Sequence, residues 1–308
     1  MLATHFPGIR TIVLDRNYGF TGGYNMAMAR LLYGPGPRPE YLLLLNSDIL
    51  VEPGWLDRLT DYMDTHPECG VCGPKLLALT HKDGAYIQTD RLEYAGAAGG
   101  YIDRFGYPFC RGRVLSRTDV DGPGYSSVKD VLWVSGACLM TRASLWEESG
   151  GLDERFFAHM EEIDYCWRAQ LAGHRVRVVP SSRVWHLGGG TLPRTSATKL
   201  RLNYRNGLLL LDNNLAPTIG RFKARVRIIT RLVLDDCSAL VYLLGGKTDF
   251  CGSVFRAHRE YRRLRKVPHK AASRNGDVRG VAPVCIILQS LLRGERIFDY
   301  LRRYEDSH

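Results

Sequence analysis

The sequence lacks any apolar run long enough to cross a membrane. The longest runs, at residues 41–45 and 207–211, are far shorter than the ~20 residues that a transmembrane helix requires. The N-terminal residues also lack the basic region, apolar segment and small-residue cleavage site of a signal peptide. Export is therefore not indicated, and we expect a cytoplasmic protein.

The sequence also lacks a cysteine pattern. Eight cysteines occur at irregular spacing, and the single close pair, Cys69 and Cys72, is not followed by the second pair or Cys/His couple that a zinc site needs. We expect reduced cysteines that serve as small apolar side chains.

Acidic residues are scarce in one part of the chain only. Residues 1–198 carry 20 Lys and Arg against 22 Asp and Glu, whereas residues 199–308 carry 22 basic against 10 acidic side chains. With 45% apolar residues over 308 positions, the chain is too apolar for wholesale disorder and long enough for one large or two ordinary domains. These observations predict a near-neutral domain at 1–198 and a basic, mainly helical region at 199–308.

Strands and helices alternate in the first part of the sequence. The expected strands are at 9–14, 41–45, 71–79, 131–134 and 175–179, and the expected helices at 24–32, 53–63, 142–148 and 156–172. Residues 80–130, rich in Gly, Tyr and Asp, are expected to be irregular. This alternation is typical of an α/β fold with a mostly parallel sheet flanked by helices, in which ligands bind beyond the carboxyl ends of the strands.

Asp48 follows directly after the apolar run at 41–45. A carboxylate at the end of a buried strand is costly unless it binds a cation or backbone donors. A divalent ion that bridges a diphosphate would explain it, and so would an Asp that caps the next turn. Position alone leaves both alternatives open.

Three carboxylates occur within four residues at Glu161, Glu162 and Asp164. Glu161, Asp164 and Arg168 share one helical face, whereas Glu162 points about 100° away from Glu161. Mutual repulsion raises at least one pKa, as general-base chemistry requires. An exposed, salt-bridged helix is the alternative, but the surrounding aromatic residues at 156–157 and 165–167 argue against it.

His186 stands before three glycines at 188–190, where it could ligate a metal while the backbone approaches a ligand closely. A structural hydrogen-bonding histidine is the alternative. Gly22 and Gly23 belong to a similar glycine-rich turn that could approach a nucleotide. Their spacing does not fit G-x-G-x-x-G, so a dinucleotide-binding fold is not supported.

Six motifs in order make the chain resemble the bacterial family 2 glycosyltransferases, and most of all their rhamnosyltransferase-like subgroup. The motifs are NYGFTGGYN at 17–25, LLLNSD at 43–48 with EPGW at 52–55, SGAC at 135–138, GGLDERFF at 150–157, EEIDYCWR at 161–168 and VWHLGGGT at 184–191. The resemblance implies a GT-A fold that binds a nucleotide-diphosphate sugar and a divalent metal, Mg or Mn, and inverts the anomeric carbon.

The resemblance also implies roles for individual residues. Asp48 matches the last residue of the family's Asp-x-Asp metal motif, whose first position is Asn46 here, and His186 matches the histidine that completes the metal site. Glu162 matches the catalytic base, which is usually Asp; because Glu is longer, the base could instead be Glu161. Asp164 and Arg168 would orient the helix and its base. The nucleotide is expected to contact Gly22, Gly23, Asn25, Asn46 and Ser47.

The chain departs from the family at its beginning. Family members open with a strand, a helix and a second strand that form most of the nucleotide-base pocket, and this sequence starts after them. We therefore expect an N-terminally incomplete domain that binds the nucleotide-sugar donor weakly.

The basic region carries two dense stretches of Lys and Arg with interleaved apolar residues, at 221–231 and 256–270. Helices of this kind can lie on an anionic membrane surface, here the inner face of the cell membrane. A solvated charged face is the alternative, and no recognition motif supports nucleic acid as a partner.

Together these features predict a metal-dependent inverting glycosyltransferase of cell-envelope polysaccharide biosynthesis. It would move a hexosyl or rhamnosyl group to a hydroxyl of a glycan or lipid-linked acceptor. A non-catalytic nucleotide- or carbohydrate-binding remnant of a glycosyltransferase is the alternative, suggested by Asn46 and by the missing opening segment.

Overall fold

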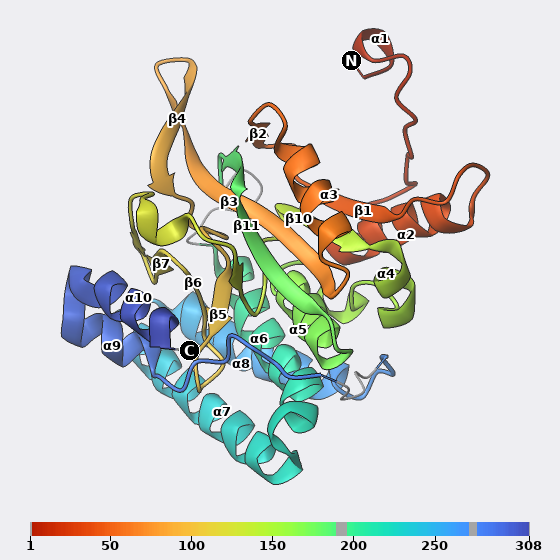
Figure 1. The fold of residues 1–308 in the computed structure, drawn as a ribbon. Helices are drawn as coiled ribbons and strands as arrows, with labels where there is room; N and C mark the ends of the chain where they lie inside the picture. Colours follow the sequence, from red (N-terminus) through yellow and green to blue (C-terminus); the bar gives the residue numbers. More distant parts are fainter. Residues whose placement is uncertain (1, 189–195, 271–275, 308) are drawn as a thin grey trace.

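A computed structural model describes residues 2–188, 196–270 and 276–307 (Figure 1). Its central sheet has the strand order β1–β10–β3–β11–β2, with β4 paired to β3 and β9 paired to β11. The strands are β1 (Tyr41–Leu45), β2 (Ile49–Val51), β3 (Cys69–Lys82), β4 (Ala85–Leu92), β9 (Lys129–Asp130), β10 (Cys138–Arg142) and β11 (Arg175–His186). Helices flank this sheet, which confirms the predicted α/β class.

The prediction of a mostly parallel sheet is wrong. Among the described strands, β3 and β11 form the one parallel ladder, and the remaining ladders are antiparallel. The apolar run at 41–45 indicates that both faces of β1 are covered, but two covered faces are compatible with either strand direction. The sequence pattern therefore carried no information about direction.

Side chains of β1 alternate between the two faces of the sheet, and both faces are packed. Leu42 and Leu44 belong to the cluster of buried residues that includes Trp167 of α5 (Glu161–Leu171). Tyr41 and Leu43 pack instead against the cluster formed with α3 (Trp55–Thr65). The two helices thus cover opposite faces, as the period of two along a strand dictates.

The first predicted strand, at 9–14, does not form. These residues follow the short α1 (Leu2–His5) as an extended, exposed segment, and the Val13 side chain is 82% exposed. A β-branched run becomes a strand only where a neighbouring strand supplies hydrogen bonds, and no described strand pairs with this one. The helix expected at 24–32 does form, as the longer α2 (Gly19–Tyr33).

Residues 80–130 are more regular than predicted. β3 and β4 form a hairpin that projects from the sheet (Figure 1), and a second sheet contains β5 (Gly100–Ile102), β6 (Pro108–Cys110), β7 (Arg113–Val114) and β8 (Arg117–Thr118). Gly100 fits here because a Cβ on it would lie 1.9 Å from the Trp133 ring. The strands of the second sheet are two or three residues long, too short for a period to show in the sequence, and the eight residues of β4 are almost all exposed, so they lack an alternating apolar pattern.

The remaining helices are α4 (Ala143–Ser149) between β10 and α5, and α6 (Ala197–Ile219), α7 (Arg221–Leu244), α8 (Thr248–Leu264), α9 (Ile286–Arg293) and α10 (Ile297–Ser307) in the basic region. Leu208 and Leu211 of α6 are buried in the same cluster as Trp167 of α5. The boundary at residue 198 stays a prediction, and the two regions on either side of it share one core. None of the described helices combines the length and hydrophobicity of a transmembrane span.

Candidate active site

Asp48 and His186, the two predicted metal ligands, lie together where β2 meets the end of β11. His186 pairs with Ile49 in the antiparallel ladder between these strands, and the Leu187 amide donates to the Asp48 carbonyl oxygen over 3.1 Å. This register places His186 Nε2 3.3 Å from Asp48 Oδ1. Of the glycines that follow, Gly188 is described, whereas residues 189 and 190 lie outside the described residues.

Glu93 completes this group and was missed by sequence reasoning. It is 3% exposed, and its Oε1 lies 3.4 Å from His186 Nδ1. Burial opposes protonation of His186, but Glu93 and Asp48 outweigh it and raise the pKa of His186. The contact arises through β3, since Leu77 pairs with Leu92 on one side and with β11 on the other. A single Glu in a region without a motif gives no sequence signal that would predict its contact with His186.

The donor set fits a divalent cation only in part. A carboxylate and an imidazole are both ligands of Mn²⁺, and hard cations share their oxygen ligands with phosphates. In the described part of the chain, no three His, Cys, Asp or Glu side chains are arranged to hold a metal ion by themselves. Asp48 and His186 would therefore be two protein ligands of an ion that also binds diphosphate oxygens.

Glu161 and Glu162 open α5 and have different environments. Glu161 is 4% exposed, and burial together with the Glu162 charge raises its pKa well above the usual range. Glu162 is partly exposed; burial of its carboxyl raises the pKa to about 7, against the opposing effect of the Glu162, Ile163 and Met160 amides. A carboxyl that ionises near neutral pH and is partly exposed suits a general base better than a buried one.

The loop at 135–138, which leads into β10, lies close to both the start of α5 and the end of β1. A Cβ built on Gly136 would lie 3.4 Å from the Cβ of Glu162. The next residue, Ala137, accepts a hydrogen bond from the Asn46 amide over 2.9 Å. Glu162 and the Asn46 backbone therefore both lie close to this one short loop.

Cys110 of β6 lies within electrostatic range of both Glu93 and Glu162. Burial raises the pKa of its thiol to about 11, and the charges of Glu93 and Glu162 both act to raise it. Glu93 contacts His186, which contacts Asp48. The influence of both Glu93 and Glu162 on Cys110 is compatible with a common site of the predicted metal ligands and the predicted base, which stays a prediction.

Gly22 and Gly23 lie inside the first two turns of α2 and not in a loop before it. The helix begins at Gly19, whose φ of 73° and whose proximity to Phe157, 2.5 Å from a Cβ built there, admit only glycine. The Phe20 amide donates to the Phe157 carbonyl oxygen over 2.9 Å, so this amide of the first turn already has a protein partner. Nucleotide contact by Gly22 and Gly23 stays a prediction.

Asn25 joins α2 to the loop before α5. Its amide donates to the Leu152 carbonyl oxygen over 2.8 Å and accepts from the Leu152 amide over 3.0 Å. This pairing gives Asn25 a positioning role within the fold. Ser47 is exposed and Asn46 partly exposed beside Asp48, so both can be reached by a ligand, and their nucleotide contacts stay predictions.

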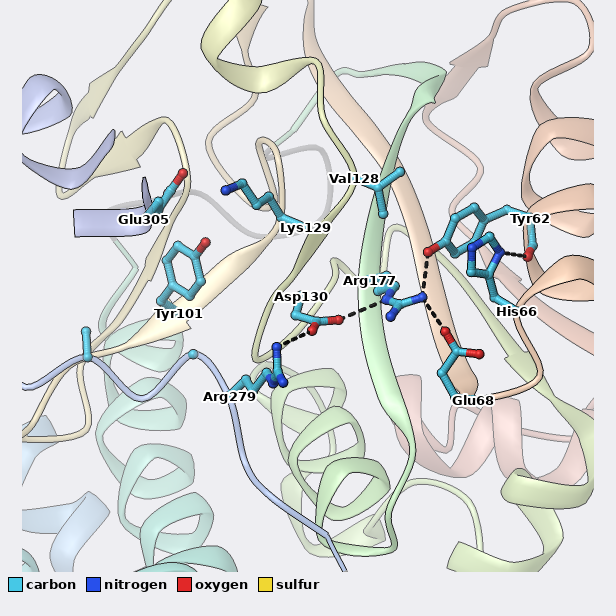
Figure 2. A pocket seen from close by; sticks show the side chains of 12 residues that line it. Tyr62, His66, Glu68, Tyr101, Val128, Lys129, Asp130, Arg177, Arg279 and Glu305 are labelled. Carbon is cyan, nitrogen blue, oxygen red and sulfur yellow. Dashed lines mark hydrogen bonds and ion pairs between the residues drawn. The ribbon is translucent and has the colours of Figure 1, made fainter. Parts of the chain in front are cut away.

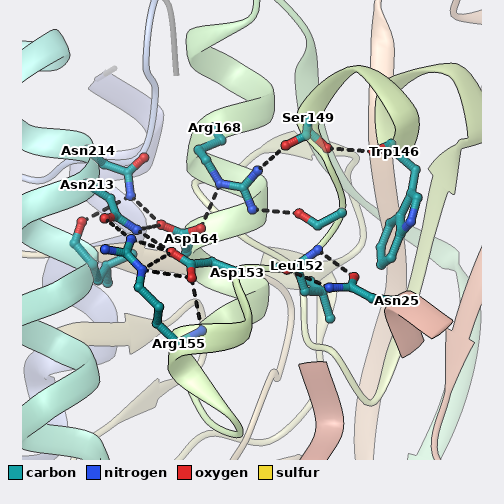
Figure 3. A network of polar contacts seen from close by, with 12 residues as sticks. Asn25, Trp146, Ser149, Leu152, Asp153, Arg155, Asp164, Arg168, Asn213 and Asn214 are labelled. Carbon is teal, nitrogen blue, oxygen red and sulfur yellow. Dashed lines mark hydrogen bonds and ion pairs between the residues drawn. The ribbon is translucent and has the colours of Figure 1, made fainter. Parts of the chain in front are cut away.

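Asp164 lies in a buried network of polar contacts with Arg168, Asn213 and Asn214 (Figure 3). It is fully buried, and its carboxylate accepts from Arg168 Nε over 2.7 Å and from the side-chain amides of Asn213 and Asn214, each over 2.8 Å. With both oxygens engaged in this way, the carboxylate has no access to a substrate. These contacts fit the orienting role that the resemblance implies for Asp164 better than a direct catalytic role, and its role stays a prediction.

A cavity lies elsewhere, beside the beginning of β11 (Figure 2). Its volume is about 690 Å³, and its lining charges are mostly paired: Arg177 donates to Asp130 and Glu68, and Arg279 donates to Asp130. It contains none of the residues predicted from the motifs. Paired charges leave little unsatisfied potential for an anionic ligand.

Comparison with known proteins identifies the family. The sequence profile described as "Glycosyltransferase like family 2" matches residues 2–207. The chain belongs to this family and is a glycosyltransferase.

Relatives with a named activity are similar over about two thirds of the chain. The N-acetylglucosaminyl-diphospho-decaprenol L-rhamnosyltransferase of Mycobacterium tuberculosis (strain ATCC 25618 / H37Rv) is 28% identical over 211 residues, 67% of each chain. The rhamnosyltransferase WbbL of Escherichia coli (strain K12) is 27% identical over 187 residues, 60% of this chain and 66% of that protein. Among solved structures, the mannosyltransferase PcManGT from Pyrobaculum calidifontis in complex with GDP-Man and Mn²⁺ matches with a TM-score of 0.44 at 11% identity, over 84% of this chain and 71% of that one.

Proposed function

We propose that this glycosyltransferase moves a rhamnosyl or related hexosyl group from a nucleotide-diphosphate sugar to a hydroxyl group of a lipid-linked glycan, with inversion and with a divalent metal. The observations that carry the proposal are the mutual contacts of Asp48, His186 and Glu93 and the closeness of both the Asn46 backbone and Glu162 to the loop at 135–138. The named activities of the relatives support the choice of sugar and acceptor.

Glu162 is the base in this proposal. The ionised carboxylate takes the proton of an acceptor hydroxyl while that oxygen forms a bond to the anomeric carbon and the bond from this carbon to the diphosphate oxygen breaks. One displacement of this kind inverts the carbon. Between the two alternatives for the base, partial exposure favours Glu162, because Glu161 is too deeply buried to meet an acceptor.

Asp48 and His186 would hold a bound Mg²⁺ or Mn²⁺, which neutralises charge on the departing diphosphate. Glu93 acts on His186: a carboxylate facing Nδ1 fixes the ring orientation so that Nε2 points toward Asp48. Asn46, in place of the first Asp of the family motif, offers an amide oxygen instead of a second charge.

The test compares Glu162→Gln with Glu148→Gln, a change at an exposed Glu of α4. Transfer is measured from dTDP-rhamnose to a polyprenyl-diphosphate N-acetylglucosamine, with Mn²⁺. We expect Glu162→Gln to lower kcat by about 10²- to 10⁴-fold, the usual contribution of a general base, and Glu148→Gln to leave it unchanged. Equal activities of the two variants would remove Glu162 from the mechanism.

A non-catalytic binding protein is the second candidate, favoured by the replacement at Asn46. It predicts binding of the nucleotide diphosphate with Mn²⁺ but no transfer and no hydrolysis of the sugar nucleotide by the wild-type protein. The same assay therefore separates the two candidates.

We also propose that the basic region lies on an anionic membrane surface, at the inner face of the cell membrane. The support is an apolar stripe along the exposed side of α7, flanked near its start by the exposed Arg221, Lys223 and Arg225. Such a helix buries its apolar side in the lipid interface while its cations meet the headgroups. The stripe consists of Phe222, Val226, Ile229, Val233, Leu240 and Leu244, which are 48–81% exposed and recur at helical spacing.

Flotation with vesicles of phosphatidylglycerol and phosphatidylcholine tests the membrane proposal. We expect the wild-type protein to float with anionic vesicles, the Phe222→Asp/Val226→Asp variant to stay behind, and Val13→Asp, at an exposed site outside α7, to behave as the wild type. Exclusion of the wild-type protein from these vesicles at every salt concentration would refute the proposal.

A further inference from the structure

We propose that Asn206 and Arg205 of α6 are positioning residues that hold the segment in front of α5 in an unfavourable backbone conformation and thereby set the position of Glu162. This inference rests on the proposed function for the role of Glu162. The clamp itself is defined by contacts between two side chains and three backbone carbonyl groups.

Asn206 is fully buried, and its side-chain amide lies within hydrogen-bonding distance of three carbonyl oxygens, those of Phe156 at 3.1 Å, Ala158 at 2.8 Å and His159 at 2.7 Å. Arg205 Nη2 donates to the Phe156 oxygen as well, over 2.6 Å. Two residues of one helix therefore bind most of the carbonyl groups of a single turn of chain.

The orientation of the Asn206 amide follows from its other neighbour. Arg205 Nε lies 2.8 Å from Asn206 Oδ1. Because a guanidinium group can only donate, the oxygen of the amide must face Arg205, and the NH₂ group must face the carbonyl oxygens. The pair thus acts as one unit in which the Asn206 NH₂ group and Arg205 Nη2 point at the segment, while Arg205 Nη1 donates to Glu260 of α8.

The clamped segment is strained. Phe157, His159 and Met160 have φ values of 63°, 72° and 70°, in the region that side chains other than glycine rarely adopt. A residue in this conformation is strained and persists only where the surroundings enforce it. Without the Asn206 and Arg205 donors, buried carbonyl groups would lose their partners and the segment would relax.

Relaxation of this segment would act directly on the base. Met160 is the residue before the first turn of α5, and its amide, with those of Glu162 and Ile163, stabilises the charged form of the Glu162 carboxyl. The other titratable groups that interact with Glu162 are Glu161 on the same helix, Cys166 one turn further and Cys110 of β6. Displacing Met160 should therefore raise the pKa of Glu162 and misplace its carboxyl.

The test compares Asn206→Ala with Asn203→Ala, the same change at a partly exposed Asn one turn earlier in α6. Amide hydrogen exchange, ¹³C NMR titration of labelled glutamate and transfer kinetics are measured for both. For Asn206→Ala we expect exchange at 157–163 to be about tenfold faster, which corresponds to about 1.4 kcal/mol of local stability. We expect kcat to fall about 10- to 100-fold, as for a catalytic group misplaced by an ångström. The acid limb of the pH profile should move up by at least about half a unit, with donor KM nearly unchanged.

Unchanged exchange at 157–163 together with an unchanged acid limb in Asn206→Ala would overturn the proposal, as would equal effects in Asn203→Ala. If Asn206→Ala fails to fold, the same measurements are made on Arg205→Lys, which keeps the charge but removes the forked donor. Their result then decides whether the proposal holds. Exchange and NMR titration need no turnover. A wild-type protein without transferase activity would thus refute the proposed function while these two measurements still decide whether the clamp exists.

Discussion

Replacing Asp164 by Asn tests whether this carboxylate is an anchor or a catalytic group. The substitution keeps the shape of the side chain but replaces one acceptor oxygen by a donor and removes the negative charge. Arg168, which is 6% exposed and bonded to Asp164 over 2.7 Å, would remain as a buried cation without its partner. The amides of Asn213 and Asn214 already share Oδ1, so the one oxygen that remains could serve either these amides or Arg168, but not all three.

The expected cost follows from this burial. Breaking a buried ion pair by removing one partner typically destabilises a protein by about 3–5 kcal/mol, because the other charge is left uncompensated. Asp164 is fully buried, so solvent cannot screen the loss. We expect the free energy of unfolding to fall by this amount, measured by urea denaturation at pH 7.

Asp299→Asn serves as the matched control. Asp299 also pairs with an arginine of its own helix, Arg302, over 2.6 Å, but its side chain is 63% exposed. Exposed pairs contribute about 0–1 kcal/mol, so this variant should unfold almost as the wild type does. If Asp164→Asn were to lose transfer activity while its free energy of unfolding stayed within about 1 kcal/mol of the wild type, Asp164 would act on substrate and the reasoning would fail.

Three further predictions concern pH and the metal. Because burial raises the pKa of Glu162 from 4.5 to about 7, kcat/KM should rise as pH increases through about 7, and a profile flat from pH 5 to 9 would contradict this. The raised pKa of Glu162 means that folding favours the protonated form of its carboxyl. The free energy of unfolding therefore falls as pH rises from about 4.5 through about 7. At pH 8, Glu162→Gln should unfold at a higher urea concentration than the wild type. Glu93→Gln should weaken Mn²⁺ binding in calorimetry by about 10- to 100-fold, as expected for a group that orients a metal ligand; unchanged affinity would leave Glu93 without this role.

The parts of the fold that sequence periodicity predicts are those whose environment is encoded locally. The apolar run in β1 indicated two covered faces, and the helical spacing of Leu59 and Met63 indicated α3; both form. The run at 9–14 had the same local composition as a strand, but it has no paired neighbour among the described strands. Pairing partners lie far away in sequence, so a local pattern could not reveal which run would remain exposed.

The candidate site also contains residues that the sequence predicts and contacts that it does not. Asp48 and His186 are 138 positions apart, and it was the order of the family's motifs, not their spacing, that placed them in one site. Glu93 belongs to no motif and reaches His186 only through the pairing of β4 with β3. Asp164 stood in a recognisable motif from which an orienting role was expected, but its partners Asn213 and Asn214 come from another helix, so they could not be deduced from its neighbours in sequence.

The bonds from α6 to the start of α5 have a consequence for the order of events during synthesis. Asn214 and Asp164 are 50 residues apart, and Asn206 and Phe156 are also 50 apart. Since domains begin to fold from the N-terminal side while the ribosome is still at work, the sheet can assemble before these partners have emerged. A nascent chain that ends before α6 would lack the bonds from Asn206 and Asn214 that hold the start of α5. The position of Glu162 described above is therefore reached only after α6 has been made.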